Sequence, residues 1–303
     1  MRRSRWAAWV AAAGAGLAGL VLAVPVFYEV SVSLMTPVEA RALPPLPFPS
    51  DPQFGHYGSG WNGIGLGGLL FTTALLAILA AALQILTGAA AAFALARLRF
   101  PGRRAVLRAV VILAAIPSVV LLVPRFVMVD AWGWSEEFTG LAVPALVSAG
   151  AILFLYHVFQ TLPRELEESA RLDGAGHWQV FSRVVVPQAR PALAVVAGFA
   201  ILAQWRGLLW PLVVSRRSGP EVAEQGLALH ITGSASGLSV PELLAVGVTL
   251  AIPAMATAVW VVLSRGRARA ASAARMARGR ALEGHLPGEV SPLITGPFEH
   301  QIL

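Results

Sequence analysis

Long apolar segments, separated by short basic or proline-rich connections, make up most of the chain. A helix needs about 20 apolar residues to cross roughly 30 Å of hydrocarbon. Six stretches approach or exceed that length, which predicts an all-α, polytopic membrane protein with six transmembrane helices. The predicted spans run approximately over residues 6–34, 69–96, 106–129, 141–159, 191–214 and 243–263.

The first stretch has an alternative interpretation as a cleaved signal peptide, because Arg2, Arg3 and Arg5 precede it. The apolar core of a signal peptide is about 7–15 residues long. The apolar run that begins at Trp6 is longer than that. We therefore predict a helix that the mature protein retains.

Arginine residues gather in alternate connections, and this asymmetry predicts the orientation. They cluster before the first span, between spans two and three, between spans four and five, and after span six. Loops rich in basic residues face the cytoplasm, so both termini and residues 161–190 are predicted to be cytoplasmic. The proline-rich connection 35–68 and the connection 215–241 are then external. Residues 1–303 are expected to form one transmembrane domain that ends in a flexible tail, 282–303.

The amino-acid composition limits the reactions and the binding sites that this chain can provide. Of 303 residues, 56% are hydrophobic and 13% charged, and the mean hydropathy is +0.69; soluble proteins carry about 25% charged residues. The absence of Cys excludes disulfides and thiol catalysis, and the absence of Lys excludes a P-loop for ATP. We expect no cofactor or metal in this chain and no ATPase site of its own. The net charge of +7 is better explained by topology than by a nucleic-acid partner.

Residues 161–190 are the most charged part of the chain between two spans. Thr161 is expected to cap a helix whose first turn accepts Pro163. Acidic side chains near its start suit the positive end of the helix dipole, and apolar side chains recur every four residues on one face. These acidic residues are Glu165, Glu167 and Glu168, and the apolar ones are Leu162, Leu166 and Ala170.

Two glycines, Gly174 and Gly176, are expected to end this helix. A second short helix is predicted over His177 to Arg183, before Pro187. Such an amphipathic helix has three uses that the residues alone leave open. It can lie on the membrane surface, pack against its own bundle, or dock into a groove on a soluble partner.

A spaced motif in this segment resembles a known family. Glu168-Ser169-Ala170, three residues, Gly174, nine residues and then Val184 to Pro187 follow the pattern Glu-Ala-Ala, three residues, Gly, nine residues, Ile-x-Leu-Pro of ABC-importer permeases. The run Ala170, Asp173, Gly174, Ala175 is similar to the carbohydrate branch, in particular the maltose-transporter-type second permease. Two further stretches resemble that family, namely residues 96–102 and Trp205 with Trp210-Pro211.

The resemblance implies a six-span, type I importer permease in the bacterial inner membrane. It further implies a second, different permease subunit, two copies of an ATPase that binds ATP and Mg, and a periplasmic or lipid-anchored solute-binding protein. The solute is expected to be a sugar or oligosaccharide, with a glycerol-phosphate or polyol solute as the alternative. Membrane lipid surrounds the spans.

The resemblance also implies which residues couple the permease to the ATPase, through a coupling helix that docks in an ATPase groove. In this sequence Ser169 replaces the first Ala, and Val184 and Val186 replace Ile and Leu. The structural alternatives are that Gly174 is only a helix cap and that Glu168 is only solvated. The residues implied in coupling are Leu166, Glu168, Ser169, Ala170, Asp173, Gly174, Ala175 and Pro187.

Trp205, Arg206 and Trp210 are candidates for the substrate pathway, because aromatic faces stack on sugars and polar groups bind hydroxyls. Arg206 stands where the family often has Asn. The alternative is that these residues hold the bundle together or lie in an interfacial aromatic belt. An intramembrane enzyme and a secondary transporter are further alternatives, but neither a nucleophile and base pair nor an inverted repeat is evident.

Overall fold

The computed structural model describes residues 2–44, 46–215, 219–233 and 237–283, and for residues 2–5, 7–8 and 265–283 it describes the backbone alone. Within these residues every regular element is helical. The longer helices are α1 (Arg2–Ser33), α2 (Gly55–Gly63), α3 (Leu66–Arg97), α4 (Arg103–Ala115), α5 (Leu122–Ala131), α7 (Ala149–Thr161), α8 (Glu165–Leu172), α11 (Arg190–Trp205), α13 (Ala223–Thr232) and α14 (Val240–Glu283). The shorter pieces are α6 (Phe138–Ala142), α9 (His177–Gln179), α10 (Val186–Gln188) and α12 (Leu209–Val214), with single turns at Glu39–Arg41 and Val143–Ala145 and a π-helical turn at Val180–Val185.

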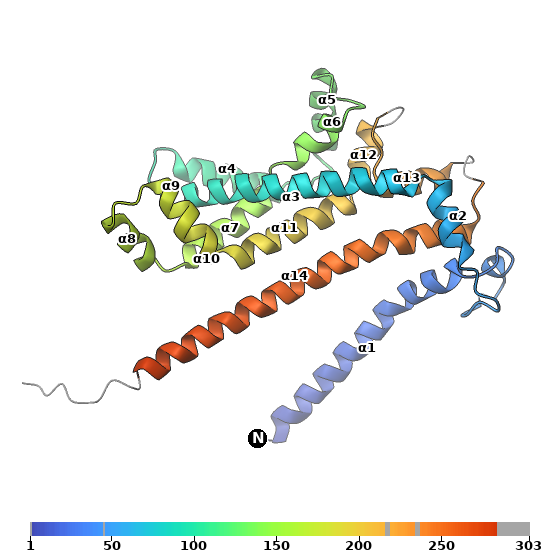
Figure 1. Cartoon of the computed structure of the whole chain (residues 1–303), viewed down its shortest axis with the longest axis horizontal. Coiled ribbons are helices and arrows are strands. Elements are labelled where there is room, and N and C mark those ends of the chain that lie inside the picture. Colours follow the sequence, from blue (N-terminus) through green and yellow to red (C-terminus); the bar gives the residue numbers. More distant parts are fainter. Residues whose placement is uncertain (1, 45, 216–218, 234–236, 284–303) are drawn as a thin grey trace, which may run out of the picture.

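The centre of the bundle is formed by α3, α7 and α11, which lie side by side (Figure 1). Helix α14 packs obliquely against α11, and α1 packs against α14. The apolar part of α1 is otherwise exposed. At one end of the bundle lie α8, α9 and α10 together with the start of α4, and at the other end lie α2 and α13 (Figure 1).

Four helical segments in the described residues are continuous and apolar enough to cross a membrane: Trp9–Ser33, Leu66–Arg97, Phe138–Thr161 and Val240–Ser264. They agree with the first, second, fourth and sixth predicted spans. A fifth candidate is a pair of helices, His177–Gln188 and Arg190–Trp205, which meet at an angle of 78°.

The third predicted span, 106–129, is divided into two helices. Helix α4 ends at Ala115 and α5 begins at Leu122. Pro117 accounts for the break, because its ring disfavours the helical conformation of the preceding residue. Ile116 accordingly has an extended backbone, with φ −74° and ψ 122°.

The fifth predicted span, 191–214, is also divided. Helix α11 ends at Trp205 and the short α12 starts at Leu209. Pro211 has no N–H to offer the carbonyl four residues earlier, at Gly207, so an unbroken helix would lose that hydrogen bond and clash there. Residues 284–303 of the predicted flexible tail lie outside the described residues.

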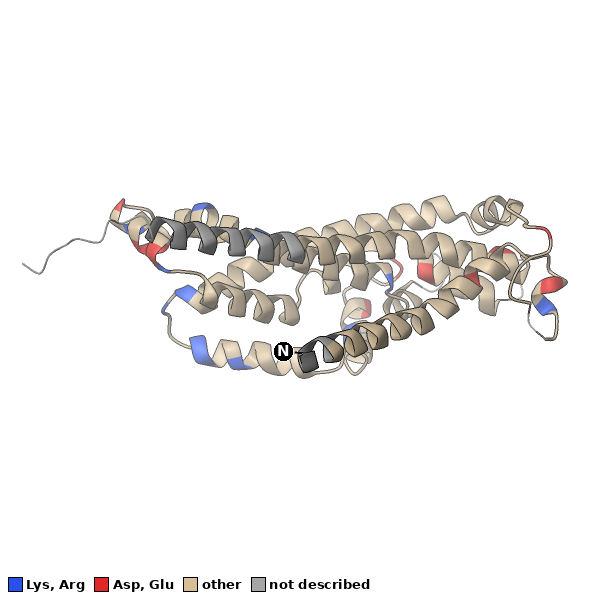
Figure 2. Cartoon of the chain, turned by 90° about the horizontal axis from the view of Figure 1, so that it is seen from below, with Lys and Arg blue, Asp and Glu red and all other residues tan. Residues whose placement is uncertain are grey.

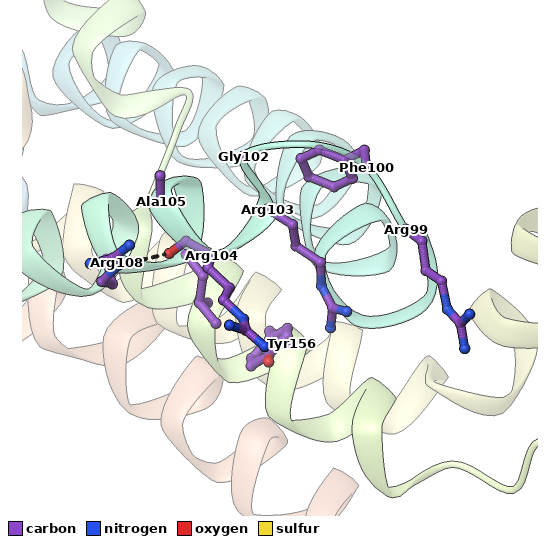
Figure 3. Close-up of a pocket in the computed structure, with 9 residues that line it drawn as sticks. Arg99, Phe100, Gly102, Arg103, Arg104, Ala105, Arg108 and Tyr156 are labelled. Carbon is purple, nitrogen blue, oxygen red and sulfur yellow. Dashed lines mark hydrogen bonds between the residues drawn. The ribbon is translucent and has the colours of Figure 1, made fainter.

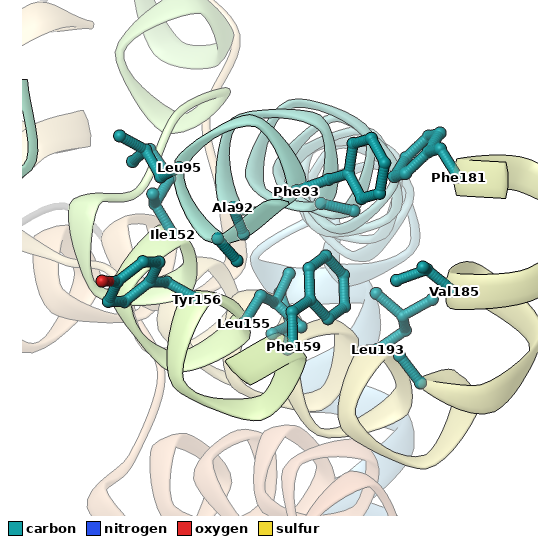
Figure 4. Packing of buried hydrophobic residues seen from close by; sticks show 14 of the residues in the cluster. Ala92, Phe93, Leu95, Ile152, Leu155, Tyr156, Phe159, Phe181, Val185 and Leu193 are labelled. Atoms are coloured by element: carbon teal, nitrogen blue, oxygen red, sulfur yellow. The ribbon is translucent and has the colours of Figure 1, made fainter. Parts of the chain in front are cut away.

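The largest buried cluster lies where α3 and α7 meet the segment from α9 to α11 (Figure 4). The Phe93 and Phe181 rings lie 5.1 Å apart between centroids. Val180, Phe181 and Val185 are buried in this cluster, and full burial of such a side chain stabilises the fold by about 1.5–3 kcal/mol. The segment that follows α8 is therefore anchored in the core of the bundle.

Charged residues are unevenly placed along the long axis (Figure 2). Arginines sit at the end of α3, at the start of α4, in α8 and between α9 and α11, which all lie at the same end of the molecule. The spans between the two ends of the molecule carry few charges (Figure 2). We call the end where these arginines gather the basic end.

Candidate coupling segment and central pocket

The coupling segment, residues 161–190, lies at the basic end and starts with α8. Its predicted cap is wrong: Thr161 is the last residue of α7, and its hydroxyl donates to the Val158 carbonyl at 2.8 Å. Pro163 lies between the two helices, and α8 begins at Glu165 without a side-chain cap. The predicted acidic first turn of α8 is present. It lies at the positive end of the helix dipole, where negative charge is favoured.

The end of α8 is a Schellman motif centred on Gly174. The Ala175 N–H donates to the Ala170 carbonyl at 2.9 Å, and the Gly174 N–H donates to the Arg171 carbonyl at 3.0 Å. Asp173 is the C-cap, and Gly174 has φ +84°, in the left-handed region that favours glycine. This bond pattern fixes the direction in which the chain leaves α8.

A buried ion pair ties α8 to the bundle. Arg97 Nε lies 2.8 Å from Glu167 Oε1, and both side chains are almost fully buried. Arg97 Nη2 also donates to the Leu162 carbonyl at 2.9 Å, just before α8. Arg97 is the last residue of α3, so one side chain joins the end of a central helix to Leu162, which precedes α8, and to Glu167 in the first turn of α8.

The outer surface of the segment is partly apolar. Leu166 is 54% exposed, Leu172 90% and Trp178 68%. Glu168, Ser169 and Asp173 are also exposed, whereas Ala170 packs partly against the buried cluster. Exposed apolar side chains that are rimmed by polar ones are typical of an interaction site.

The second helix of the segment extends further than predicted. It runs from His177 through the π-helical turn to Gln188, past the predicted end at Arg183. Its start is capped by Gln179, whose Oε1 accepts from the Gly176 N–H at 2.9 Å. Pro187 lies in its last turn, two residues before the 78° bend into α11.

A central pocket of about 400 Å³ lies between the helices of the bundle. Its polar lining includes Arg125, Ser148, Gln204 and Trp210. The Arg125 guanidinium lies over the Trp210 ring, 5.4 Å from its centroid, and Trp210 Nε1 donates to the Gly140 carbonyl at 3.1 Å. The breaks in the third and fifth predicted spans both contribute to this lining, so the proline-induced breaks help to form the pocket.

The three predicted pathway residues do not come together. Trp210 lines the central pocket, whereas Trp205 and Arg206 do not. Trp205 is buried and its Nε1 donates to the Leu250 carbonyl of α14 at 3.0 Å. Arg206 is the exposed C-cap of α11. A pathway role for Trp205 and Arg206 stays a prediction.

Sequence reasoning missed Arg97, Glu167 and Arg125 as parts of these sites. The signal for Glu167 was its position three residues before Ala170, which puts a carboxylate on the packed face of α8. A buried carboxylate needs a cation. Arg97, the last residue of α3, supplies that cation. No local signal places Arg125 against Trp210, because the two are far apart in the chain.

The described residues form an all-helical bundle with several membrane-length helices, a pocket between them and an exposed helical segment at one end. The chain belongs to the family of binding-protein-dependent transport system inner membrane components, whose model matches residues 84–264. It is therefore a multi-pass inner-membrane protein and a permease subunit of an ABC importer.

Curated relatives and one solved structure agree with this family. The chain is 28% identical over 238 residues to the diacetylchitobiose uptake system permease protein NgcG of Streptomyces coelicolor, covering 78% of each chain. It is 31% identical over 188 residues to the trehalose transport system permease protein SugB of Mycobacterium tuberculosis, covering 61% of this chain and 68% of that one. It is also 30% identical over 209 residues to the sn-glycerol-3-phosphate transport system permease protein UgpE of Rhizobium meliloti, covering 66% and 74%.

The crystal structure of a bacterial ABC transporter involved in the import of the acidic polysaccharide alginate contains a chain with the same fold. The TM-score is 0.75 at 22% identity, and the match covers 88% of this chain and 98% of that chain.

Proposed function

We propose that this chain forms one half of the pathway through which an importer moves a sugar or oligosaccharide into the cell. A second, different permease subunit forms the other half, a solute-binding protein delivers the solute, and two ATPase subunits bind ATP and Mg and drive the cycle. The similarity to permeases named for diacetylchitobiose and trehalose uptake supports the solute class. The chain itself supplies no ATPase site and no cofactor.

The proposed topology has six crossings with both termini in the cytoplasm. Helices α4 and α5 together make the third crossing, and α11 with α12 makes the fifth. The concentration of arginines at one end of the bundle supports a cytoplasmic location for that end. The coupling segment then lies in the cytoplasm, where an ATPase is located.

The observation that carries the proposal is the construction of the coupling segment: an exposed apolar and acidic helix, held by the Arg97–Glu167 pair and rooted in the core by Phe181. An element that must pass a movement on has to be stiff at both ends. The residues that act in coupling are Leu166, Glu168, Ser169, Ala170, Asp173, Gly174, Ala175 and Pro187.

The energetic requirement of coupling is one of linkage. Closure of the ATPase pair and the outward-facing state must favour each other by the same free energy. Moving a two-state equilibrium from 1:99 to 99:1 takes about 5.5 kcal/mol. A segment that bends under load would dissipate part of that free energy, and its Schellman motif and buried ion pair oppose such bending.

A second solute class, a glycerol-phosphate or polyol solute, is favoured by one observation. Arg125 lines the central pocket, and a guanidinium there suits a phosphate better than a neutral sugar. The relatives named for sn-glycerol-3-phosphate transport agree with this alternative.

The test is solute-dependent stimulation of ATP hydrolysis by the purified importer with its binding protein in a lipid bilayer. We expect a disaccharide or oligosaccharide to raise the hydrolysis rate and to be taken up. Stimulation by glycerol 3-phosphate alone would replace the first solute class by the second. Hydrolysis that no solute-loaded binding protein changes, in an intact complex, would overturn the proposed role.

A further inference from the structure

A second pocket, of about 670 Å³, lies at the basic end beside α4 and apart from the coupling segment. It is lined by four arginines and one tyrosine among its residues: Arg99, Arg103, Arg104, Arg108 and Tyr156. The arginines come from the turn after α3 and the first turns of α4, and Tyr156 comes from α7 (Figure 3). No carboxylate belongs to the lining, so this is a hollow of one sign of charge.

None of the four arginines of this basic pocket forms an ion pair within the described part of the chain. The ion pair at this end joins Arg97 to Glu167 and uses none of the four arginines. Arg103 Nε donates to the Leu95 carbonyl at 2.6 Å, and Arg108 Nε donates to the Arg104 carbonyl at 3.3 Å. These acceptors are uncharged, so they orient two guanidinium groups without neutralising them.

Tyr156 adds a hydrogen-bond donor to the charged lining. It is only 8% exposed, and its hydroxyl oxygen accepts from Gln160 Nε2 at 2.8 Å. The hydroxyl hydrogen is therefore left to donate into the pocket. A tyrosine hydroxyl beside several guanidinium groups is a set of donors without acceptors, which is the requirement for binding a phosphate group.

The surface next to the pocket identifies the kind of phosphate. Arg104 and Arg108 are four residues apart on α4, so they share a face with the residues one turn further on. Those residues, Val111 and Ile112, are 48% and 62% exposed. A free phosphate ion would use only the basic part of this face, whereas a phospholipid has a charged head and apolar chains in the same order along the helix.

We propose that the basic pocket binds the phosphate headgroup of an anionic phospholipid, whose acyl chains lie along the exposed apolar face of α4. The position agrees with the general rule that basic pockets between membrane helices on the cytoplasmic side bind anionic headgroups. Each guanidinium can hold two phosphate oxygens. The lipid would fix α4 against α7 at the end of the molecule where the coupling segment is attached. This inference requires only the membrane location, and it is independent of the solute.

The test uses the importer assembled with its ATPase subunits in nanodiscs of phosphatidylcholine that contain a minor fraction of phosphatidylglycerol. Native mass spectrometry after extraction counts the phosphatidylglycerol retained. We expect R99Q/R104Q to lower this retention more than about tenfold, because each basic residue near an anionic headgroup contributes about one kilocalorie per mole. The matched control R183Q/R190Q removes the same charge from the same end, outside the pocket, and is expected to keep retention within about twofold of the wild type.

Two further experiments test whether the loss of lipid comes from lost charge or from misfolding, and whether the ligand is a lipid or free phosphate. R99K/R104K keeps the charge, so we expect it to retain most of the phosphatidylglycerol; loss as complete as in the Gln variant would overturn the proposal. An excess of inorganic phosphate is expected to leave the lipid bound. Displacement by inorganic phosphate would overturn the lipid in favour of a soluble anion, and retention of phosphatidylglycerol at no more than its fraction in the nanodisc would overturn the site.

Discussion

The coupling segment is built from neighbours in sequence, between residues 161 and 190, whereas the central pocket takes its lining from α3, α4, α5, α7, α11 and α12. In the segment, one glycine and one ion pair fix the geometry. In the pocket, Arg125 and Trp210 share the lining with many apolar residues. Function in the first region should therefore depend strongly on single residues, and function in the second should change by degrees.

The largest effect is expected at the ion pair. R97Q leaves the Glu167 carboxylate buried without a cation, and breaking one partner of a buried pair costs about 3–5 kcal/mol. We expect solute-stimulated ATP hydrolysis to fall more than tenfold. The double variant R97Q/E167Q removes both charges and is expected to recover most of the rate. A double variant no better than R97Q would contradict a role for the pair itself.

The next largest effect is expected at Gly174. An added Cβ would meet nothing within 4 Å, so the penalty comes from the positive φ alone. A side chain in the left-handed region costs roughly 1–2 kcal/mol, more for a β-branched residue and less for Asn. We expect G174V to lower uptake by about tenfold and G174N to keep most of it, at equal amounts in the membrane. Equal activity of both variants would show that this backbone conformation does not matter to coupling.

A smaller effect is expected in the central pocket. R125Q removes the contact with the Trp210 ring, and a cation–π contact contributes about 0.5–2 kcal/mol. We expect R125Q and W210F to change the solute concentration for half-maximal uptake by a few fold, with maximal uptake retained. W205F removes the bond to the Leu250 carbonyl outside this pocket and is expected to lower thermal stability without that change in concentration. A shift in W205F as large as in W210F would favour the pathway role predicted from the sequence.

The smallest effect is expected in residues 35–54, which connect α1 to α2. Hydrogen bonds from the Ser50 hydroxyl and from the Thr36 and Ser50 N–H groups lower the pKa of Glu39 from 4.5 to about 2. The order that these bonds provide is therefore complete above the ordinary pKa and is lost progressively as the pH falls from there through about 2. Hydrogen exchange at Thr36 and Ser50, corrected for the intrinsic rate, should show constant protection from pH 7 to 5, a progressive fall below pH 4.5, and lower protection in E39Q at pH 7. Protection in E39Q equal to that of the wild type at pH 7 would contradict the role of the Glu39 carboxylate.

The two regions also differ in how far the sequence alone predicts them. The acidic start of α8, its glycine end and the helix after it follow from local rules that a sequence displays. Glycine at 174 was predicted to end the helix, and it does so at φ +84°. The position of Glu167 against Arg97 could not be obtained this way, because it depends on how α8 packs against the end of α3.

The sequence predicted the long apolar helix α3, which contains no proline, and also α14, which stays continuous although Pro253 lies within it. Apolar length predicted the third span but not where its helix divides, which depends on the effect of Pro117 on Ile116. Apolar length also says nothing about packing: α1 and α3 each have 32 residues, yet α3 lies in the centre of the bundle and the apolar part of α1 is exposed. Contacts between distant segments decide that difference.

The most direct test of the coupling role is a single-cysteine crosslink, which the absence of native Cys makes clean. Leu172 at the end of α8 and Leu43 in the connection from α1 to α2 are both 90% exposed, and the proposed topology places them on opposite sides of the membrane. In membranes that contain the whole importer, we expect L172C to crosslink to the ATPase subunit and L43C not to. A crosslink of L43C to the ATPase, or no crosslink from L172C in an importer that transports, would contradict the central claim.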